Sequence, residues 1–155
     1  MTSTHAVTVN GRTSFELEPQ PGDGCDELRE SLARLDGTAF FAFCLWRLPD
    51  GVPFDRVDLD SESQEYIQCA GGVSGRFTCE IRQLGLDGRA SHEVIGRRGD
   101  GESSTELAEF IRWAEHGTPV QRNEVLDLDE LVELFASYLA SGGIPSSYST
   151  RTLAL

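Results

Sequence analysis

Apolar positions recur every three to four residues in three stretches of the chain, the spacing of one buried side of a helix. They predict helices over residues 25–35, 103–116 and 127–141. The second and third begin with capping boxes, formed by Ser103 with Glu106 and by Asp127 with Glu130. The residues expected to be buried are Cys25, Leu28, Leu32 and Leu35 in the first, Leu107, Phe110, Ile111 and Ala114 in the second, and Leu128, Leu131, Val132, Phe135 and Leu139 in the third.

Shorter apolar runs between the helices have the length and residue types of strands. The most apolar run, residues 39–46, predicts a central strand that is buried on both faces. Residues 66–69 predict a short strand that ends at a glycine pair, and the Thr and Leu residues of 146–155 alternate as in an edge strand.

The first segment, residues 6–17, turns at an Asn-Gly pair and predicts a hairpin. A two-residue turn would place Val9 opposite a charged residue, so we expect a three-residue loop. That register pairs Val9 with Phe15 and Val7 with Leu17, which keeps the apolar side chains on one face.

A second hairpin is predicted over residues 76–97, with its turn at an Asp-Gly pair. Centring the turn on that pair places Arg82 opposite Glu93 and Ile81 opposite Val94. Opposite charges and apolar pairs are both favourable cross-strand neighbours, which supports this register.

The order of elements predicts one α+β domain over residues 1–155, with a mostly antiparallel sheet and helices packed on one face. A chain of 155 residues has room for one core, and no repeat or linker divides it.

The net charge of the chain restricts the classes of partner that it can bind. The chain has 26 acidic and 13 basic residues, a net charge of −13, and every basic residue is Arg. Such an excess argues against nucleic acid and anionic membranes and favours a basic protein partner. Without Lys, neither a Schiff base nor a phosphate-loop lysine can form. No secretory signal or membrane-length apolar run is present, so we expect a cytoplasmic protein without membrane contact.

Candidate catalytic residues are few. The four cysteines, at positions 25, 44, 69 and 79, lack the close pairs of zinc sites, so we expect buried structural thiols, no metal and no cofactor. An alternative is a small enzyme or ligand-binding protein with a pocket on the sheet, using Glu80 and His92 with Cys69 or Cys79.

Acidic residues gather in two segments, which are either a solvated surface or a docking face for a basic protein. The carboxylates concerned are Asp55, Asp58, Asp60, Glu62 and Glu65 in the first segment, and Glu124, Asp127, Asp129, Glu130 and Glu133 in the second.

The second half of the chain resembles a known family. The resemblance runs from Tyr66-Ile67-Gln68-Cys69-Ala70-Gly71-Gly72 through Phe77-Thr78-Cys79-Glu80-Ile81-Arg82 to the closing part. There Asn123-Glu124-Val125-Leu126 precedes an acidic helix with Leu134-Phe135, and Gly142-Gly143-Ile144-Pro145 follows it. This pattern is similar to the immunity proteins of bacterial polymorphic toxin systems, of the first α+β type in that series. A Trp tends to follow the Gly-x-x-Pro turn in that family, where this chain has Tyr148.

The resemblance implies a small acidic cytosolic protein that binds and neutralises a toxin domain. We therefore expect a non-catalytic inhibitor of a basic toxin domain, with the two acidic segments as contact residues. A homo-oligomer that pairs through an exposed edge strand is a further alternative.

Overall fold

A computed structural model describes residues 4–17, 25–58, 65–99 and 106–153. Two α-helices, three short 3-10 helices and nine strands lie within these residues. The helices are α1 Cys25–Ala33, η1 Phe54–Arg56, η2 Val73–Gly75, η3 Arg122–Glu124 and α2 Leu128–Ser141. The strands are β1 His5–Val9, β2 Thr13–Leu17, β3 Ala42–Arg47, β4 Tyr66–Gly71, β5 Phe77–Leu84, β6 Ala90–Arg97, β7 Glu109–Trp113, β8 His116–Val120 and β9 Tyr148–Thr152.

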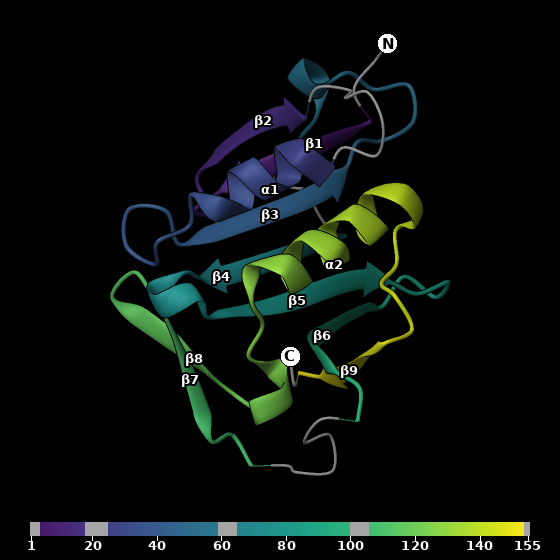
Figure 1. The fold of residues 1–155 in the computed structure, drawn as a ribbon. Coiled ribbons are helices and arrows are strands. Elements are labelled where there is room, and N and C mark those ends of the chain that lie inside the picture. Colours follow the sequence, from purple (N-terminus) through teal and green to yellow (C-terminus); the bar gives the residue numbers. More distant parts are fainter. Residues whose placement is uncertain (1–3, 18–24, 59–64, 100–105, 154–155) are drawn as a thin grey trace.

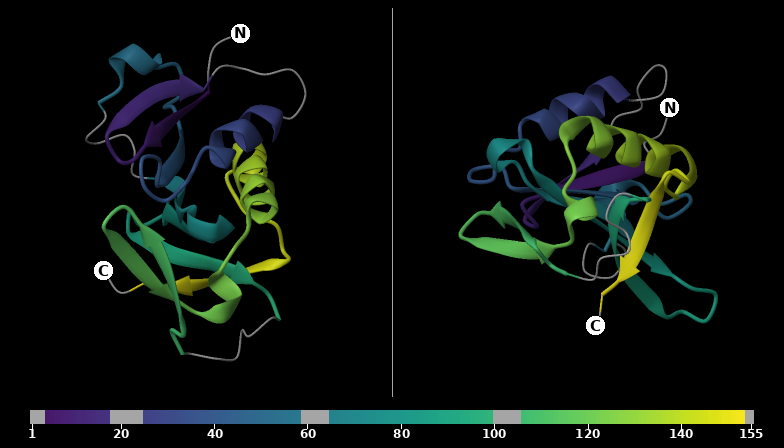
Figure 2. Two further views of the ribbon diagram at one scale, coloured as in Figure 1. Left: turned by 60° about the vertical axis from the view of Figure 1, so that its left-hand side comes forward. Right: turned by 60° about the horizontal axis from the view of Figure 1, so that its bottom comes forward.

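Seven strands form one antiparallel sheet in the order β2-β1-β3-β4-β5-β6-β9 (Figure 1). The remaining two, β7 and β8, form a separate hairpin outside this sheet in both views of Figure 2. The mostly antiparallel α+β class is therefore confirmed. So is the last strand, because β9 pairs with β6 and occupies one edge of the sheet while β2 occupies the other.

The two helices share one core with the sheet. Leu28 and Leu32 of α1 are buried together with Leu131 and Phe135 of α2, and all four belong to a cluster that includes residues of β1, β3, β4, β5 and β6. In Figure 1, α1 lies alongside β1 and β3, and α2 lies alongside β4 and β5. The apolar spacing of these two segments thus predicted both helices correctly.

The central strand is confirmed, with a later start than the sequence indicates. Strand β3 begins at Ala42, because residues 39–41 belong to the loop that precedes it. Phe43 and Leu45 contribute to the helix-containing core, whereas Trp46 points to the other face and packs with Ala6 and Leu48. β3 is therefore covered on both sides, as predicted.

The predicted helix over residues 103–116 is wrong. Its described part begins at residue 106 and forms β7 and the start of β8. Ile111 is 1% exposed while its neighbour Phe110 is 50% exposed, so burial alternates as in a strand. The chain reverses at Ala114, whose φ of +53° is a left-handed conformation that suits a tight hairpin turn. Ser103, the proposed cap, lies outside the described residues.

The hairpin of β1 and β2 forms, but its predicted register is wrong. The loop has three residues, as expected, yet Val9 pairs with Thr13 and Val7 pairs with Phe15. Arg12 N–H donates to Val9 O over 3.1 Å and closes the loop directly around the Asn-Gly pair. Loop closure fixes this register, and Phe15 remains 46% exposed as a result.

The hairpin of β5 and β6 is also displaced, by one residue. Ile81 pairs with Glu93 and Arg82 pairs with His92, not Arg82 with Glu93. The reason lies in the turn, where Gly85 N–H bonds to Arg89 O over 2.8 Å. The extra turn residue moves every partner of β5 to the adjacent position on β6.

Candidate functional site

A groove of about 610 Å³ lies where the C-terminal end of α2 meets the ends of several strands. Its walls come from the start of β1, the end of β3 and the loop after it, the residue before β4, the end of β5, and the last turn of α2. The charged and titratable residues that line it are His5, Arg47, Asp50, Glu65 and Tyr138. Glu65 is thus the one member of the first acidic segment that lines this groove among the described residues.

The electrostatics of this groove favour a cation. The last turn of α2 contains no basic residue, so no charged side chain of that turn offsets the negative end of the helix dipole. Glu65 lies nearby and accepts a hydrogen bond from Leu84 N–H over 3.0 Å. Burial and the Glu65 carboxylate raise the pKa of Tyr138 to about 12. Arg47, paired with Asp50 over 3.2 Å, is the positive charge inside the groove.

His5 is neutral in this environment. Burial first, and then the charge of Arg47, lower the pKa of the His5 side chain. A cationic ligand in the groove therefore would not meet a charged histidine at neutral pH.

The rest of the first acidic segment is only partly described. Asp55 lies in η1 and is exposed, and Asp58 is exposed in the chain that follows it. Asp60 and Glu62 lie outside the described residues. The two described aspartates are exposed and remain candidates for contact with a partner.

The second acidic segment begins with a residue that cannot contact a partner. The Glu124 side chain is 2% exposed and accepts two hydrogen bonds from Arg151, from Nε over 2.8 Å and from Nη2 over 2.9 Å. It also accepts the Gln121 N–H over 2.7 Å. A Cβ atom at Gly96 would overlap the Asn123 side chain, so η3 packs directly on β6. The prediction that Glu124 is a surface contact is wrong, because its buried carboxylate is hydrogen-bonded to Arg151 and Gln121 of the same chain.

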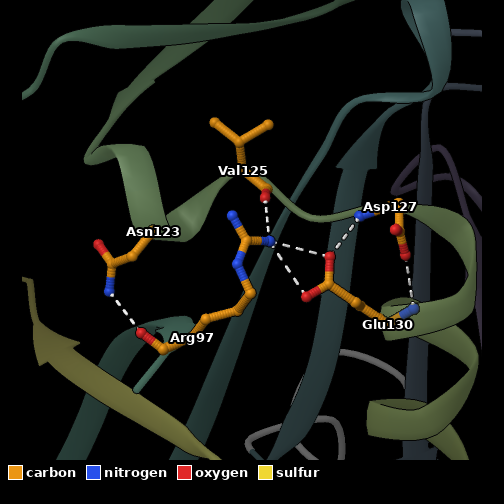
Figure 3. Close-up of polar contacts among 5 residues, drawn as sticks. All are labelled: Arg97, Asn123, Val125, Asp127 and Glu130. Carbon is orange, nitrogen blue, oxygen red and sulfur yellow. Dashed lines mark hydrogen bonds and ion pairs between the residues drawn. The ribbon is translucent and has the colours of Figure 1, made fainter. Parts of the chain in front are cut away.

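Glu130 is also engaged within the chain (Figure 3). Arg97 Nη1 donates to both of its carboxylate oxygens, over 2.9 and 3.1 Å, and to Val125 O over 2.7 Å. Asp127 and Glu130 form the predicted capping box, in which each side chain accepts the other residue's backbone N–H. Asn123 Nδ2 donates to Arg97 O over 3.1 Å. These five residues join β6 to the start of α2.

Asp129 and Glu133 are more exposed than Glu124 and Glu130. Asp129 pairs with Arg29 of α1 over 2.8 Å, with 80% of its side chain accessible. Glu133 is exposed and raises the pKa of Tyr148, after the larger effect of burial. The second segment therefore mixes structural carboxylates, at Glu124, Asp127 and Glu130, with accessible ones at Asp129 and Glu133.

The alternative catalytic residues are divided between the two faces of the sheet. His92 Nε2 lies 2.5 Å from Glu80 Oε1, and the His92 ring meets Tyr66 edge-on with centroids 6.1 Å apart. Cys69 and Cys79 belong to the helix-containing core and are fully buried. Because Cys79 is adjacent to Glu80 on one strand, its side chain points to the opposite face.

The thiols are also in the wrong protonation state for catalysis. Burial raises the pKa of both Cys69 and Cys79 well above the usual value, so neither is a thiolate at neutral pH. The prediction of structural thiols fits this finding for these two residues. A Cys-His pair with His92 is excluded by the geometry of the sheet.

The described residues contain no group of three or more His, Cys, Asp or Glu side chains arranged to hold a metal. None of their helices has both the length and the apolar character needed to cross a membrane.

Comparison with protein-family models, with curated proteins and with solved structures gives no match to this chain. The site is therefore interpreted from its own geometry.

Proposed function

We propose that this protein is a non-catalytic inhibitor that binds a basic protein domain, as an immunity protein binds its toxin. The observation that carries the proposal is that many arginines form ion pairs within the chain. Among the described residues, at least seven arginines pair with carboxylates: Arg29, Arg34, Arg47, Arg76, Arg89, Arg97 and Arg151. With 26 acidic and 13 basic residues, carboxylates outnumber arginines, and among the described ones Asp55, Asp58 and Glu133 are exposed.

The contact face that fits best combines the first acidic segment with the groove at the end of α2. Asp55 and Asp58 supply exposed carboxylates, and Glu65 carries negative charge into the groove. The helix end adds carbonyl groups there that suit an inserted Arg or Lys of the partner. A contact of this kind would give fast association that slows as salt is added.

We further interpret the sheet as covered by both helices on one face. Alternation places Cys69 and Cys79 toward the helices, and Glu80 and His92 away from them. The second candidate function, a small enzyme, would use this opposite face. The 2.5 Å contact of Glu80 with His92 favours it, because a carboxylate orients an imidazole that acts as a base.

We expect the neighbouring gene to encode a protein with a basic C-terminal domain, and the test is co-expression with that domain followed by measurement of bacterial growth. The native chain should protect the cells, and the variant with Asp55→Arg and Asp58→Arg should lose protection. A control with Glu16→Arg and Glu115→Arg has the same net charge and changes two other exposed carboxylates, so it should still protect.

Association rates of the purified pair provide the second measurement. The Asp55 and Asp58 variant should associate more slowly than the control at low salt, and the difference should shrink as salt is added. Equal rates for the two variants, or a neighbouring gene that encodes no such domain, would contradict the proposal. His92→Gln separates the candidates, because an inhibitor still protects the cells with this change, whereas turnover of a small molecule by the purified chain would require His92 and be lost.

A further inference from the structure

A second groove, of about 430 Å³, lies between α1 and the loop end of the β1–β2 hairpin. Its base contains Val9, Leu35 and Phe43, of which the last two are almost fully buried. Phe15 and Phe40 also line it, and each is 46% exposed. Two large aromatic side chains thus stand beside an apolar base and are partly open to solvent.

The loop that carries Phe40 is held by specific hydrogen bonds. Asn10 Nδ2 donates to Ala39 O over 2.8 Å, and Asn10 Oδ1 accepts the Phe41 N–H over 2.9 Å. The Asp36 carboxylate accepts the Phe40 N–H over 3.1 Å. The backbone of Phe40 is therefore held at the edge of the groove, where its side chain is 46% exposed. A preformed site loses less conformational entropy when a ligand binds.

The charge of this groove is opposite to that of the whole protein. Arg12 and Arg34 line it, and none of its described lining residues is acidic. Arg34 is held only by an exposed contact with Glu30, one helical turn away, at 3.5 Å. Among the described residues, no carboxylate pairs with Arg12. Arg12 and the weakly paired Arg34 are therefore the two guanidinium groups that can meet an anion in this groove.

We propose that this groove binds a small amphiphilic carboxylate, an apolar chain that ends in one carboxylate group. The apolar part would lie against Phe15 and Phe40, and the carboxylate would accept hydrogen bonds from Arg12 and Arg34. The volume is within the range of small-molecule sites, which combine an apolar lining with few polar groups. This site is separate from the proposed contact face and does not depend on it.

The experiment is isothermal titration calorimetry of the full chain with decanoate, below the concentration at which decanoate forms micelles. Decanol and decylammonium serve as probes of the same chain length with no charge and with positive charge. Decanoate should bind at one saturable site and more tightly than either. In the variant with Arg12→Gln and Arg34→Gln, decanoate should bind about tenfold more weakly, and decanol should bind as before.

Two further variants make the result specific to the groove. Arg56→Gln with Arg89→Gln removes the same charge from two other exposed arginines and should leave decanoate binding unchanged. Phe40→Ala should weaken both decanoate and decanol, and its thermal midpoint shows whether the fold is kept. The proposal is overturned if decanoate does not bind, if decylammonium binds as tightly, or if the Arg12 and Arg34 variant binds decanoate normally. A groove that accepts only a protein segment would give the first of these results.

Discussion

The two acidic segments have similar composition but different environments in the structure. In the second segment, Glu124 is buried against Arg151, and Glu130 is bound by Arg97 and by the start of α2. In the first segment, Asp55 is exposed in a 3-10 helix of three residues. The arginines make the difference, because β6 and β9 bring them to one segment from elsewhere in the chain. A run of carboxylates therefore remains a candidate docking face only where its side chains stay exposed in the fold.

Glu124 provides the strongest test of this difference between the two acidic segments. The substitution Glu124→Gln keeps the shape of the side chain and removes the charge that neutralises Arg151. Breaking a buried ion pair on one side costs about 3–5 kcal/mol. Because Arg151 is 28% exposed, we expect a loss in the free energy of unfolding near the lower limit. Urea denaturation measures it.

Two outcomes at this position can be distinguished. Replacing both partners, Glu124→Met with Arg151→Met, removes the charges together and should recover much of the loss. A loss from Glu124→Gln as small as that of an exposed carboxylate would contradict the structural role of Glu124 and return it to the candidate surface.

A smaller effect is expected at Asp127, whose carboxylate accepts the Glu130 N–H over 2.9 Å at the start of α2. The substitution Asp127→Ala removes this cap and should lower the free energy of unfolding by about 1 kcal/mol. Asp127→Asn is the matched control, because its amide oxygen can still cap the helix. If Asn proved as destabilising as Ala, the charge at the helix start would matter more than the hydrogen bond.

The parts of this fold that were predicted from sequence are those with local causes. Helix α2 was found from its capping box and apolar spacing, and its end was found from Gly142, which has a φ of +78°. Hairpin β7–β8 was missed because Ala114 and the residue after it form the turn without the Asn-Gly or Asp-Gly pair that usually indicates one. Phe110 and Ile111 fit either spacing, so periodicity alone could not decide.

The candidate site depends on longer-range relations. A one-residue error in the register of β5 and β6 gave Arg82 the wrong cross-strand partner, although the pairing looked favourable. The contact of Arg97 with Glu130 joins a strand to a helix across 33 residues, and no local signal indicates it. The two grooves are likewise properties of packing, because each draws its lining from several separate segments.

The smallest loss in the free energy of unfolding is expected at Asp55. This position tests whether the first acidic segment has no structural role. The substitution Asp55→Asn removes one exposed charge, so the free energy of unfolding should change by no more than about 0.5 kcal/mol. Asp129→Asn is the comparison from the second segment, since its exposed pair with Arg29 should contribute about 0.2–1 kcal/mol. Urea denaturation of both variants, beside Asp127→Ala, places the three carboxylates on one scale. If Asp55→Asn destabilises the protein as much as Asp127→Ala, the first segment also carries structure, and its assignment as a contact face loses its basis.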